Sequence, residues 1–555
     1  MVKPQAVILL LLAFVIFYLL PLTTHGLWIP DETRYAQISQ EMLLSGNWAS
    51  PHLMGLRYFE KPALGYWIIA LGQSLFGDNL FGVRIASAIS LGLSTVLAYL
   101  IAQRLWNSPR TSLACATVYM SFGLIISQAG YANLDPQFAL WVNLSIVALW
   151  YAIDGAARRT KVIAWVVLGL ACGMGFMTKG FLALLLPVLI ALPYMIWQRR
   201  VKELLRYGGI AVLVATLISL PWVLTIHVRE PDFWRFFFWH EHIRRFAGDD
   251  AQHAEPWWFY GPLLIASSLP WALLLPTTLK HAWQNRQQPK TVFLLMWLCI
   301  PLFFFSLSKG KLPPYILPCM LPLALLIGDA LINWLEQAKT LAIRTNAVFN
   351  LVLGLAAVVA VVYLQINHPL FVHEPLHLAL LIVALACWIL ANALQISKPE
   401  IFYLAPAVGM WLAVALLPTA LPDNVVDNKT PGKFIAEHAQ ALRLSHSLMS
   451  NDLAVASALA WRTANPRVTL YNTVGEAKYG LAYPDVADRT VKTANVQQWL
   501  TQARREGSVG VVMRVKSEDE RHEFEQLPTD ATRYEQGTEV ILLYPQTDPA
   551  HITIK

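Results

Sequence analysis

Long apolar stretches, separated by short polar segments, run through the chain as far as residue 421. A transmembrane helix needs about 20 apolar residues to cross the hydrocarbon core of a bilayer. The first stretch lacks a small-residue cleavage site, so we interpret it as an anchor and not as a signal peptide. The pattern predicts a mostly α-helical, polytopic membrane protein with about 13 transmembrane helices. The thirteen stretches are residues 5–22, 81–103, 111–129, 136–153, 162–178, 180–197, 207–227, 257–279, 291–307, 313–334, 346–365, 374–396 and 401–421.

Lysine and arginine residues gather in every second loop between these stretches. Because cytoplasmic loops carry an excess of these residues, the chain is predicted to have a cytoplasmic N-terminus and a periplasmic C-terminus. The same loops account for most of the net charge of +7, so this charge does not call for nucleic acid as a partner. The sequence contains no nucleotide-binding glycine-rich loop.

Composition supports a membrane protein and narrows its chemistry. Charged residues make up 14% of the chain, whereas soluble domains contain about 25%, and the mean hydropathy is +0.47. The five cysteines all fall in apolar stretches without paired spacing. They support neither a disulfide framework nor a zinc site.

Three polar regions are predicted to lie on the periplasmic side, at residues 23–80, 228–256 and 422–555. The first contains two short amphipathic segments, which are expected to lie along the membrane interface as helices. In the third, strand-like runs alternate with helical patterns, which predicts a small α/β domain. We therefore expect a transmembrane domain over residues 1–421 and a soluble α/β domain over residues 422–555.

Six cations fall in these outer segments, next to helices, where positive charge is uncommon. Such cations are costly unless they bind an anion, and a lipid phosphate at the membrane surface is the natural candidate. For any one of them, a solvated surface position is an equally good explanation. For the six together, a phosphate site is the better one. They are Lys61, Lys179, Arg244, Arg245, Lys309 and Lys311.

Carboxylates occur in the same outer segments. Asp31, Glu60 and Asp135 fit glycosyl transfer between phosphates, in which cations hold the phosphates and a carboxylate supports the oxocarbenium-like sugar. A simpler explanation stays open at each position. Asp31 and Asp135 could cap helices, and Glu60 could form an exposed ion pair with Lys61.

Histidines beside Glu241 raise the question of a metal ion. His240 and His242 are two residues apart, which is the wrong spacing for two ligands on one helical face. A divalent ion held by Glu60 and His242 remains a hypothesis, and hydrogen-bonded loop histidines are the commoner outcome. No cofactor is predicted to be required.

Several motifs, taken in order, resemble one family. Residues 28–35 (WIPDETRY) look like the first outer loop of membrane glycosyltransferases with the GT-C fold, which use polyprenyl-phosphate sugars. More narrowly, the chain resembles the bacterial aminoarabinose transferases that modify lipid A, from the first outer loop to the soluble tail. The motifs are GLRYFEKP at 55–62, CGMGFMTKGF at 172–181, EHIRRFA at 241–247, KGKLPPY at 309–315 and GEAKYGL at 475–481.

The resemblance implies a reaction and a location. Such an enzyme moves 4-amino-4-deoxy-L-arabinose from undecaprenyl phosphate onto phosphate groups of lipid A, at the periplasmic face of the bacterial inner membrane. The added cationic sugar masks negative charge and so confers resistance to polymyxin and other cationic peptides. The expected partners are the lipid-linked donor, the lipid A acceptor and membrane lipids.

The resemblance also implies roles for cations and tyrosines. Lys61 and Arg245 would hold the undecaprenyl phosphate, with Tyr315 as a hydrogen-bond donor. Lys179 and Tyr58 are further candidates for binding substrate.

Among the carboxylates, the resemblance places Asp31 near the anomeric carbon, assisted by Asp135. Glu60 would orient Lys61 or bind an ion. Glu476, in the soluble tail, would be needed for activity, with the sugar amine as its partner.

Two other functions stay open. Another GT-C enzyme with a different acceptor, such as a protein O-mannosyltransferase, would differ only in what it modifies. A lipid-linked sugar transporter would instead favour inverted repeats and broken helices around a site at the membrane midplane. The unusual charges of this chain gather at one face, and no repeat is evident.

Overall fold

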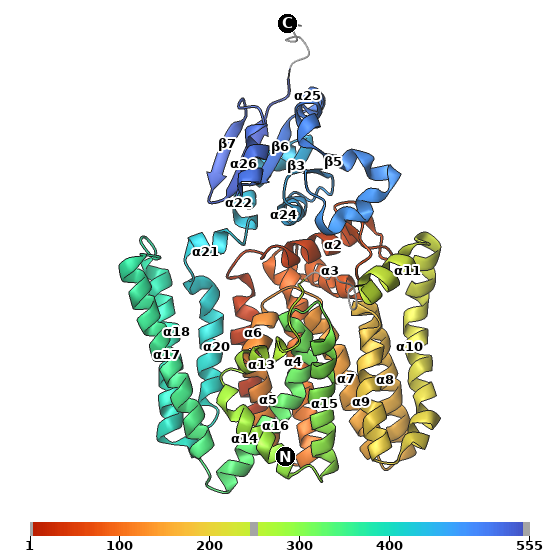
Figure 1. Cartoon of the computed structure of the whole chain (residues 1–555), viewed down its shortest axis with the longest axis vertical. Coiled ribbons are helices and arrows are strands. Elements are labelled where there is room, and N and C mark those ends of the chain that lie inside the picture. Colours follow the sequence, from red (N-terminus) through yellow and green to blue (C-terminus); the bar gives the residue numbers. More distant parts are fainter. Residues whose placement is uncertain (1–3, 245–252, 548–555) are drawn as a thin grey trace. The chain divides into compact units, whose positions relative to one another are not determined.

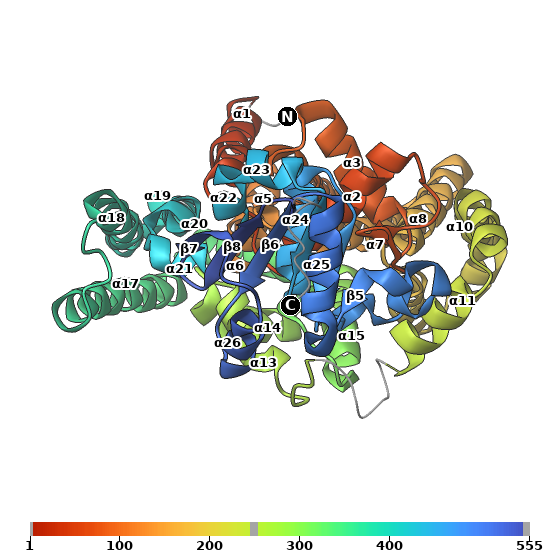
Figure 2. The same cartoon turned by 90° about the horizontal axis from the view of Figure 1, so that it is seen from above.

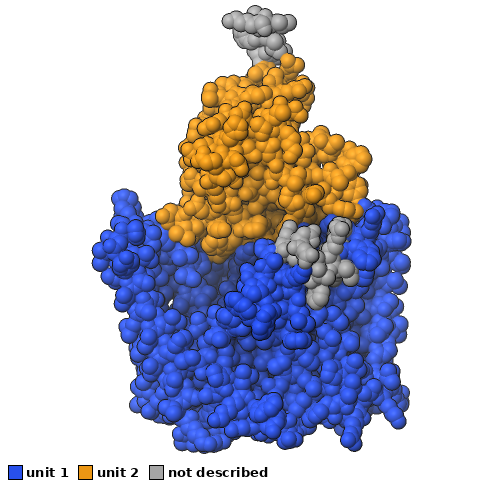
Figure 3. Space-filling model, in the orientation of Figure 1, with its two compact units in different colours: residues 1–24, 60–65, 84–422 blue, residues 25–59, 66–83, 423–555 orange. Residues whose placement is uncertain are grey.

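The computed structural model of the chain describes residues 4–244 and 253–547 (Figure 1). The chain folds into two compact units, which Figure 3 colours separately. Unit 1 comprises Met1–Thr24, Glu60–Gly65 and Arg84–Pro422, and unit 2 comprises His25–Phe59, Tyr66–Val83 and Asp423–Lys555. Most of the first polar region therefore belongs to the same unit as the C-terminal residues.

The described part of unit 1 consists of helices joined by short turns. Its N-terminal helix, α1 (Pro4–Phe14), continues through η1 (Val15–Leu19) and η2 (Leu20–Thr23). The other helices are α4 (Leu80–Trp106), α5 (Pro109–Ser121), α6 (Gly123–Ala129), α7 (Asp135–Asp154), α8 (Arg158–Lys179), α9 (Leu182–Trp197), α10 (Val201–Arg229), α11 (Phe233–Arg235), η3 (Phe236–Arg244), α13 (Tyr260–Ser267), η4 (Ala272–Leu274), α14 (Leu275–Gln284), α15 (Pro289–Leu307), η5 (Pro313–Ile316), α16 (Leu317–Glu336), α17 (Leu341–Asn367), α18 (Pro375–Ser397), α19 (Pro399–Phe402) and α20 (Ala405–Ala420).

Eight helices in the described residues are long and apolar enough to cross a membrane, or up to ten if two bent helix pairs each count as one span. The prediction of a mostly helical, polytopic membrane protein is confirmed. Shorter apolar helices at Val7–Thr23, Leu182–Trp197 and Ala405–Ala420 coincide with three further predicted stretches. Thirteen spans therefore stay a prediction.

Two of the predicted stretches are bent helix pairs and not straight helices. Residues 111–129 form α5 and α6 at 63° to each other, and 257–279 fall in α13 and α14, which lie at 117°. Proline has no backbone N–H, and broken backbone at membrane depth needs partners inside the protein. Here the two bends supply partners to each other, since Gly123 N donates to the carbonyl of Leu269 at 3.0 Å.

A neighbouring helix completes the hydrogen bonds of the second bend. The side-chain amides of Asn346 and Asn350, one turn apart on α17, both donate to the carbonyl of Pro270, at 2.9 and 2.7 Å. Trp271 Nε1 donates to the hydroxyl of Ser121 at 2.9 Å. The bend is therefore a packed part of the unit.

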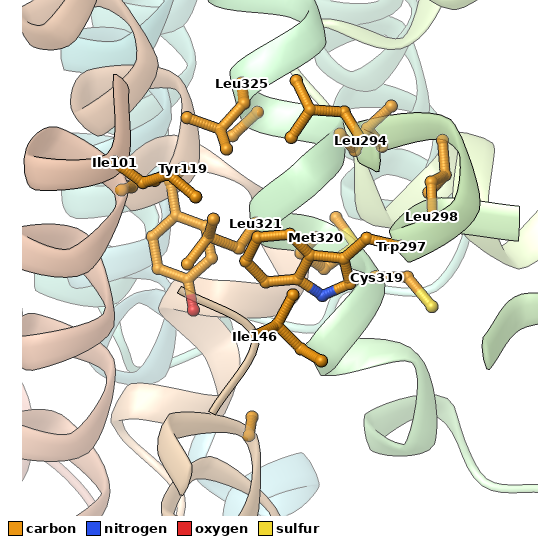
Figure 4. Close-up of a cluster of buried hydrophobic side chains, with 14 of the residues drawn as sticks. Ile101, Tyr119, Ile146, Leu294, Trp297, Leu298, Cys319, Met320, Leu321 and Leu325 are labelled. Atoms are coloured by element: carbon orange, nitrogen blue, oxygen red, sulfur yellow. The ribbon is translucent and has the colours of Figure 1, made fainter. Parts of the chain in front are cut away.

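A continuous apolar core holds the middle helices of unit 1 together. Figure 4 shows Trp297 of α15 packed between side chains of α16 and α7, with Tyr119 of α5 beside Leu321. Fully buried Trp and Tyr side chains each remove a large apolar area from water. Within the unit, α17 and α18 lie at one end and α8 to α10 at the other (Figures 1 and 2).

Unit 2 contains a six-stranded sheet in the order β5-β4-β3-β6-β8-β7. The four strands β3 to β6 are parallel, and β8 and β7 add antiparallel to one edge. Helix α2 of the first polar region packs against α24, which follows β3. The strands are β1 (His52–Leu53), β2 (Leu56–Arg57), β3 (Ser447–Ser450), β4 (Val468–Tyr471), β5 (Thr490–Val491), β6 (Val509–Arg514), β7 (Thr532–Gln536) and β8 (Glu539–Tyr544). The helices are α2 (Asp31–Ser45), α3 (Leu64–Phe76, which begins in unit 1), α21 (Asp423–Asp427), α22 (Gly432–Glu437), α23 (Ala439–Leu444), α24 (Leu453–Thr463), η6 (Gly475–Lys478), η7 (Gly480–Ala482), η8 (Pro484–Arg489), η9 (Thr493–Asn495), α25 (Val496–Glu506) and α26 (Glu518–Glu525).

Candidate active site

An ion pair joins two neighbouring helices of unit 1. Asp135 is the first residue of α7 and Lys179 is the last residue of α8, and these helices pack against each other. An acid at a helix N-terminus and a base at a helix C-terminus are both stabilised by the helix dipole. Lys179 Nζ donates to Asp135 Oδ1, and the two side chains are only 11% and 13% exposed. Helix order alone therefore brings these charges together.

Gly180 fixes the position of Lys179. Its φ of +92° belongs to a region that side chains rarely adopt. The glycine ends α8 directly after Lys179 and lets the chain reverse into α9. Any other residue at position 180 would strain this reversal.

Tyr315 packs under the same lysine. The two prolines before it begin the short turn η5, and the ring of Tyr315 lies 4.5 Å from Lys179 Nζ. A cation over an aromatic face is attracted by the ring. Tyr315 and Lys179, both predicted to bind substrate, therefore lie together in the structure.

Lys61 forms a second buried ion pair in unit 1. Its Nζ donates to Glu241 Oε2 at 2.8 Å and to the carbonyl of Glu60 at 2.9 Å. The carboxylate of Glu60 is farther away, at 3.9 Å. Because the Lys61 and Glu241 side chains are 15% and 11% exposed, solvent screens this pair weakly. Glu60 thus contacts Lys61 mainly through its backbone carbonyl, and the two roles predicted for its carboxylate stay predictions.

Both ion pairs face one cavity. It has a volume of about 110 Å³, enough for several water molecules and comparable to a small polar head group. Its charged lining is Lys61, Glu241, Lys179 and Asp135, and its other lining residues are Phe138, Leu182, Phe304, Phe305, Ser308, Gly310 and Tyr315. Four predicted site residues from separate parts of the sequence, Lys61, Asp135, Lys179 and Tyr315, therefore converge on this cavity.

An apolar groove of about 800 Å³ runs along α8, α9 and α10 in the same unit. Apolar side chains dominate its lining, with Gly208 and Gly209 leaving room along α10. Phe181 lines this groove, and the next residue, Leu182, lines the cavity. The linings of the groove and the cavity therefore include neighbouring residues at the start of α9.

A different cluster of charges lies within unit 2. The guanidinium of Arg34 on α2 forms ion pairs with Asp31, one turn earlier, and with Glu476 of η6. The hydroxyl of Tyr58 donates to Glu476 at 3.2 Å. Glu476 follows β4, beyond the carboxyl end of a parallel strand, where open α/β sheets commonly bind ligands. Three predicted site residues, Asp31, Glu476 and Tyr58, therefore share one arginine.

The structure corrects two interpretations of single residues. Asp31 is not a helix cap, because the N-cap position of α2 is Pro30 and no side-chain cap bond forms. Lys311 is not available to a phosphate, because its buried ammonium donates to the carbonyls of Glu255 and Ser308. Burial lowers the pKa of Lys311. This lysine ties two loops together.

Three predicted residues cannot be placed. Arg245 lies outside the described residues, and so do the side chains of Arg244 and His242. In the part of the chain that the structure describes, no group of three or more His, Cys, Asp or Glu side chains could hold a metal ion. The hypothesis that Glu60 and His242 bind an ion therefore stays a prediction.

Sequence reasoning missed two members of these clusters. Arg34 stands three residues after Asp31 in a segment expected to be helical, and that spacing alone could have suggested the pairing. Glu241 gave no comparable signal, because its partner Lys61 lies 180 residues earlier in the chain. Only the fold brings those two together.

A helical membrane unit with a lysine-lined cavity beside an apolar groove defines a class of protein, the polytopic membrane transferases that act on phosphate-bearing lipids. Comparison with known proteins narrows this class. Residues 426–544 match a family model described as the C-terminal domain of arabinosyl transferase ArnT. Residues 5–237 match a model described as dolichyl-phosphate-mannose-protein mannosyltransferase.

Full-length relatives define the family. The chain is 65% identical to undecaprenyl phosphate-alpha-4-amino-4-deoxy-L-arabinose arabinosyl transferase 1 of Pseudomonas fluorescens Pf-5, over 99% of this chain and 100% of the relative. It is 58% identical to the corresponding transferase of Pseudomonas aeruginosa UCBPP-PA14, over the same shares. The crystal structure of ArnT from Cupriavidus metallidurans bound to undecaprenyl phosphate superposes with a TM-score of 0.81 at 22% identity, covering 98% of both chains, and shows the same fold. The chain belongs to the family of undecaprenyl phosphate-alpha-4-amino-4-deoxy-L-arabinose arabinosyl transferases.

Proposed function

We propose that this chain transfers 4-amino-4-deoxy-L-arabinose from undecaprenyl phosphate to phosphate groups of lipid A. The observation that carries the proposal is the pair of buried lysines, Lys61 and Lys179, in one cavity beside an apolar groove. A lipid-linked sugar phosphate requires both features, since its phosphate needs cations and its isoprenoid chain needs an apolar surface. The identity of 58–65% to full-length arabinosyl transferases supports this reaction over protein mannosylation.

In this reaction, an oxygen of the acceptor phosphate attacks the anomeric carbon, and the bond from that carbon to the donor phosphate breaks. The acceptor is already ionised at neutral pH, so no general base has to remove a proton. Lys61, together with Arg245 from the sequence-based prediction, would offset charge on the leaving phosphate, and Tyr315 would donate a hydrogen bond to it. Single displacement with inversion is the expected course.

The carboxylates have electrostatic roles in this mechanism. Asp31 would support positive charge that develops on the sugar ring, and Asp135 would assist it. The cationic amine of the sugar suits Glu476 as a partner, and Tyr58 would hold that carboxylate in place. No step requires a metal ion.

The isoprenoid chain of the donor would lie in the groove along α8, α9 and α10. Its lining is apolar over the length of these helices, and its end at Phe181 adjoins the cavity that would hold the phosphate. A lipid in this position would present its head group to Lys61 and Lys179.

We further propose thirteen spans in the bacterial inner membrane, with a cytoplasmic N-terminus and a periplasmic C-terminus and active site. The ten long or bent spans and the three shorter apolar helices together support this number. Tags inserted after residue 156, 203 or 285 should be cytoplasmic, and tags after residue 250 or at the C-terminus should be periplasmic. A C-terminal tag that proteases cannot reach in spheroplasts would contradict this orientation.

The reaction is tested by mass spectrometry of lipid A. Cells that lack the chain should have unmodified lipid A phosphates, and wild-type chain should restore the aminoarabinose adduct and polymyxin resistance. Glycosylated protein with unmodified lipid A would favour the mannosyltransferase alternative. Donor lipid that reaches the periplasmic side with its sugar still attached would favour the lipid-linked sugar transporter.

A further inference from the structure

Lys61, the proposed phosphate ligand, is already neutralised by a carboxylate. Glu241 approaches it to 2.8 Å, and both side chains line the cavity. A donor phosphate that binds Lys61 would meet the carboxylate of Glu241 at the same ammonium. Two anions in a weakly screened site repel each other, so a bound phosphate would weaken the contact between Glu241 and Lys61.

The proposed transfer, on which this inference rests, increases the charge of the donor phosphate. Before transfer the phosphate is a diester with one negative charge. After the bond to the sugar breaks, its electron pair stays on the phosphate oxygen and gives a monoester that is largely doubly charged at neutral pH. The acceptor phosphate changes from monoester to diester and loses the same charge. The lipid product is therefore held by Lys61 more tightly than the donor was.

We infer that Glu241 exchanges with the phosphate at Lys61 and thereby promotes release of undecaprenyl phosphate. In the empty site Glu241 is the closest carboxylate to the buried ammonium, at 2.8 Å against 3.9 Å for Glu60, and helps to offset the cost of burying that charge. The donor displaces it, and after transfer Glu241 competes with the more highly charged product. Glu241 acts through Lys61 and contacts neither sugar nor acceptor in this scheme.

The other carboxylates near the two lysines suit this exchange less well. Glu60 is adjacent to Lys61 in the sequence and its carboxylate is 3.9 Å from the ammonium, so it would stay nearby whether or not phosphate is bound. Asp135 is paired with Lys179. Glu241 comes from η3, a separate segment, and can withdraw without moving Lys61.

The test compares Glu241→Gln, which keeps the shape but loses the charge, with Glu241→Asp, which keeps the charge. Purified full-length protein in nanodiscs is assayed for inhibition by undecaprenyl phosphate and for donor turnover. In Glu241→Gln the inhibition constant of undecaprenyl phosphate should fall by about tenfold to a hundredfold, the range of one charge-assisted hydrogen bond. Steady-state kcat should fall after a first-turnover burst, because product release becomes limiting. Glu241→Asp should behave like the parent.

Controls separate the inference from the proposed phosphate site. Glu255→Gln removes an exposed acid from a nearby loop and should change nothing. Lys61→Met should weaken inhibition by undecaprenyl phosphate, and if it does not, the proposed site itself is wrong. If Lys61→Met weakens inhibition while Glu241→Gln leaves it unchanged or also weakens it, the exchange role of Glu241 is overturned and the phosphate site stands.

Discussion

Units 1 and 2 each contain a cluster of acids and bases, but the clusters are built from different bases. In unit 1, each cavity lysine has one close carboxylate partner, Glu241 for Lys61 and Asp135 for Lys179. In unit 2, the single guanidinium of Arg34 faces the two carboxylates of Asp31 and Glu476. Lysine is a compact charge on a flexible stem, whereas the planar fork of arginine holds carboxylates in fixed directions.

This difference separates sites that exchange ligands from sites that hold residues in place. A phosphate can replace the close carboxylate at a lysine while the other contacts of that lysine, such as those of Lys61 with Glu60, stay in place. An anion that displaced Asp31 or Glu476 from Arg34 would also disturb the ion pair between Arg34 and the other acid. We therefore expect the lysine cavity to bind and release the lipid phosphate, and Arg34 to keep Asp31 and Glu476 in position.

The largest effect is expected from removing a cavity lysine. Lys61→Ala or Lys179→Ala should lower transfer by up to about a thousandfold, because losing one preorganised charge that faces the leaving phosphate costs up to about 4 kcal/mol of barrier. The measurement is lipid A mass spectrometry with an immunoblot of membranes to show that the variant accumulates. Lys280→Ala, an exposed position on α14, is the control and should be nearly silent. Equal losses at all three positions would indicate general folding damage.

Asp31→Asn should have the next largest effect. Asparagine keeps the size of the side chain but removes the negative charge, and loss of one preorganised electrostatic contact typically costs about 10²–10³ in rate, roughly 3–4 kcal/mol of barrier. The variant should fold and still bind undecaprenyl phosphate, since that lipid is assigned to unit 1. Its kcat is measured against Asp519→Asn, an exposed acid on α26. Normal amounts of modified lipid A from Asp31→Asn would remove its catalytic role.

Much of the fold could be predicted from the sequence because it depends on local composition. The apolar stretches located the long helices of unit 1, and the alternation of strand and helix patterns indicated the α/β part of unit 2. The bend at Pro270 was missed, because a hydropathy pattern does not show which backbone carbonyls need hydrogen-bond donors. Its partners, Asn346 and Asn350, lie about 80 residues later and are recognisable only in the packed structure.

The candidate site was predicted to a different degree in each cluster. Lys61, Lys179 and Asp135 stood out because charges at the ends of apolar stretches are unusual. Their pairing with specific partners could not be inferred, since Glu241 and Lys61 meet only through the fold. Lys311 shows the converse error, because a cation in an outer loop can serve backbone carbonyls as well as a phosphate.

A smaller effect is expected when Arg34 is replaced by lysine. Arg34→Lys keeps the charge but loses the planar, forked set of N–H donors. Either Asp31 or Glu476 should therefore lose its ion-pair partner. The loss of one hydrogen bond to a charged group, about 1.5–3 kcal/mol, corresponds to a tenfold to hundredfold fall in kcat. Arg57→Lys is the matched control, because Arg57 pairs at 2.9 Å with Asp485, which is largely exposed, and exposed pairs contribute little. If Arg34→Lys is as active as the control, the distinction between the clusters is wrong.

The smallest effect on transfer, none at all, is expected at a buried acid of unit 2 outside both clusters. Glu539 of β8 is 3% exposed, and burial raises its pKa from the ordinary 4.5 to about 7 despite the nearby guanidinium of Arg514. Below pH 4.5 the acid is protonated in the folded and unfolded chains alike. Between pH 4.5 and about 7 only the folded chain keeps the proton, so the free energy of unfolding should fall as pH rises, by roughly 3 kcal/mol in all.

Glu539→Gln should abolish this dependence, because the amide does not titrate. Hydrogen exchange of the β6 and β8 amides in the full-length protein, measured from pH 5 to 8 and corrected for intrinsic exchange, reports local stability. The parent should lose protection over this range, and the variant should keep a constant level while transferring aminoarabinose at the parental rate. A variant with the parental pH dependence would show that another group titrates. A variant with impaired transfer would extend the functional acids of unit 2 beyond those that Arg34 holds.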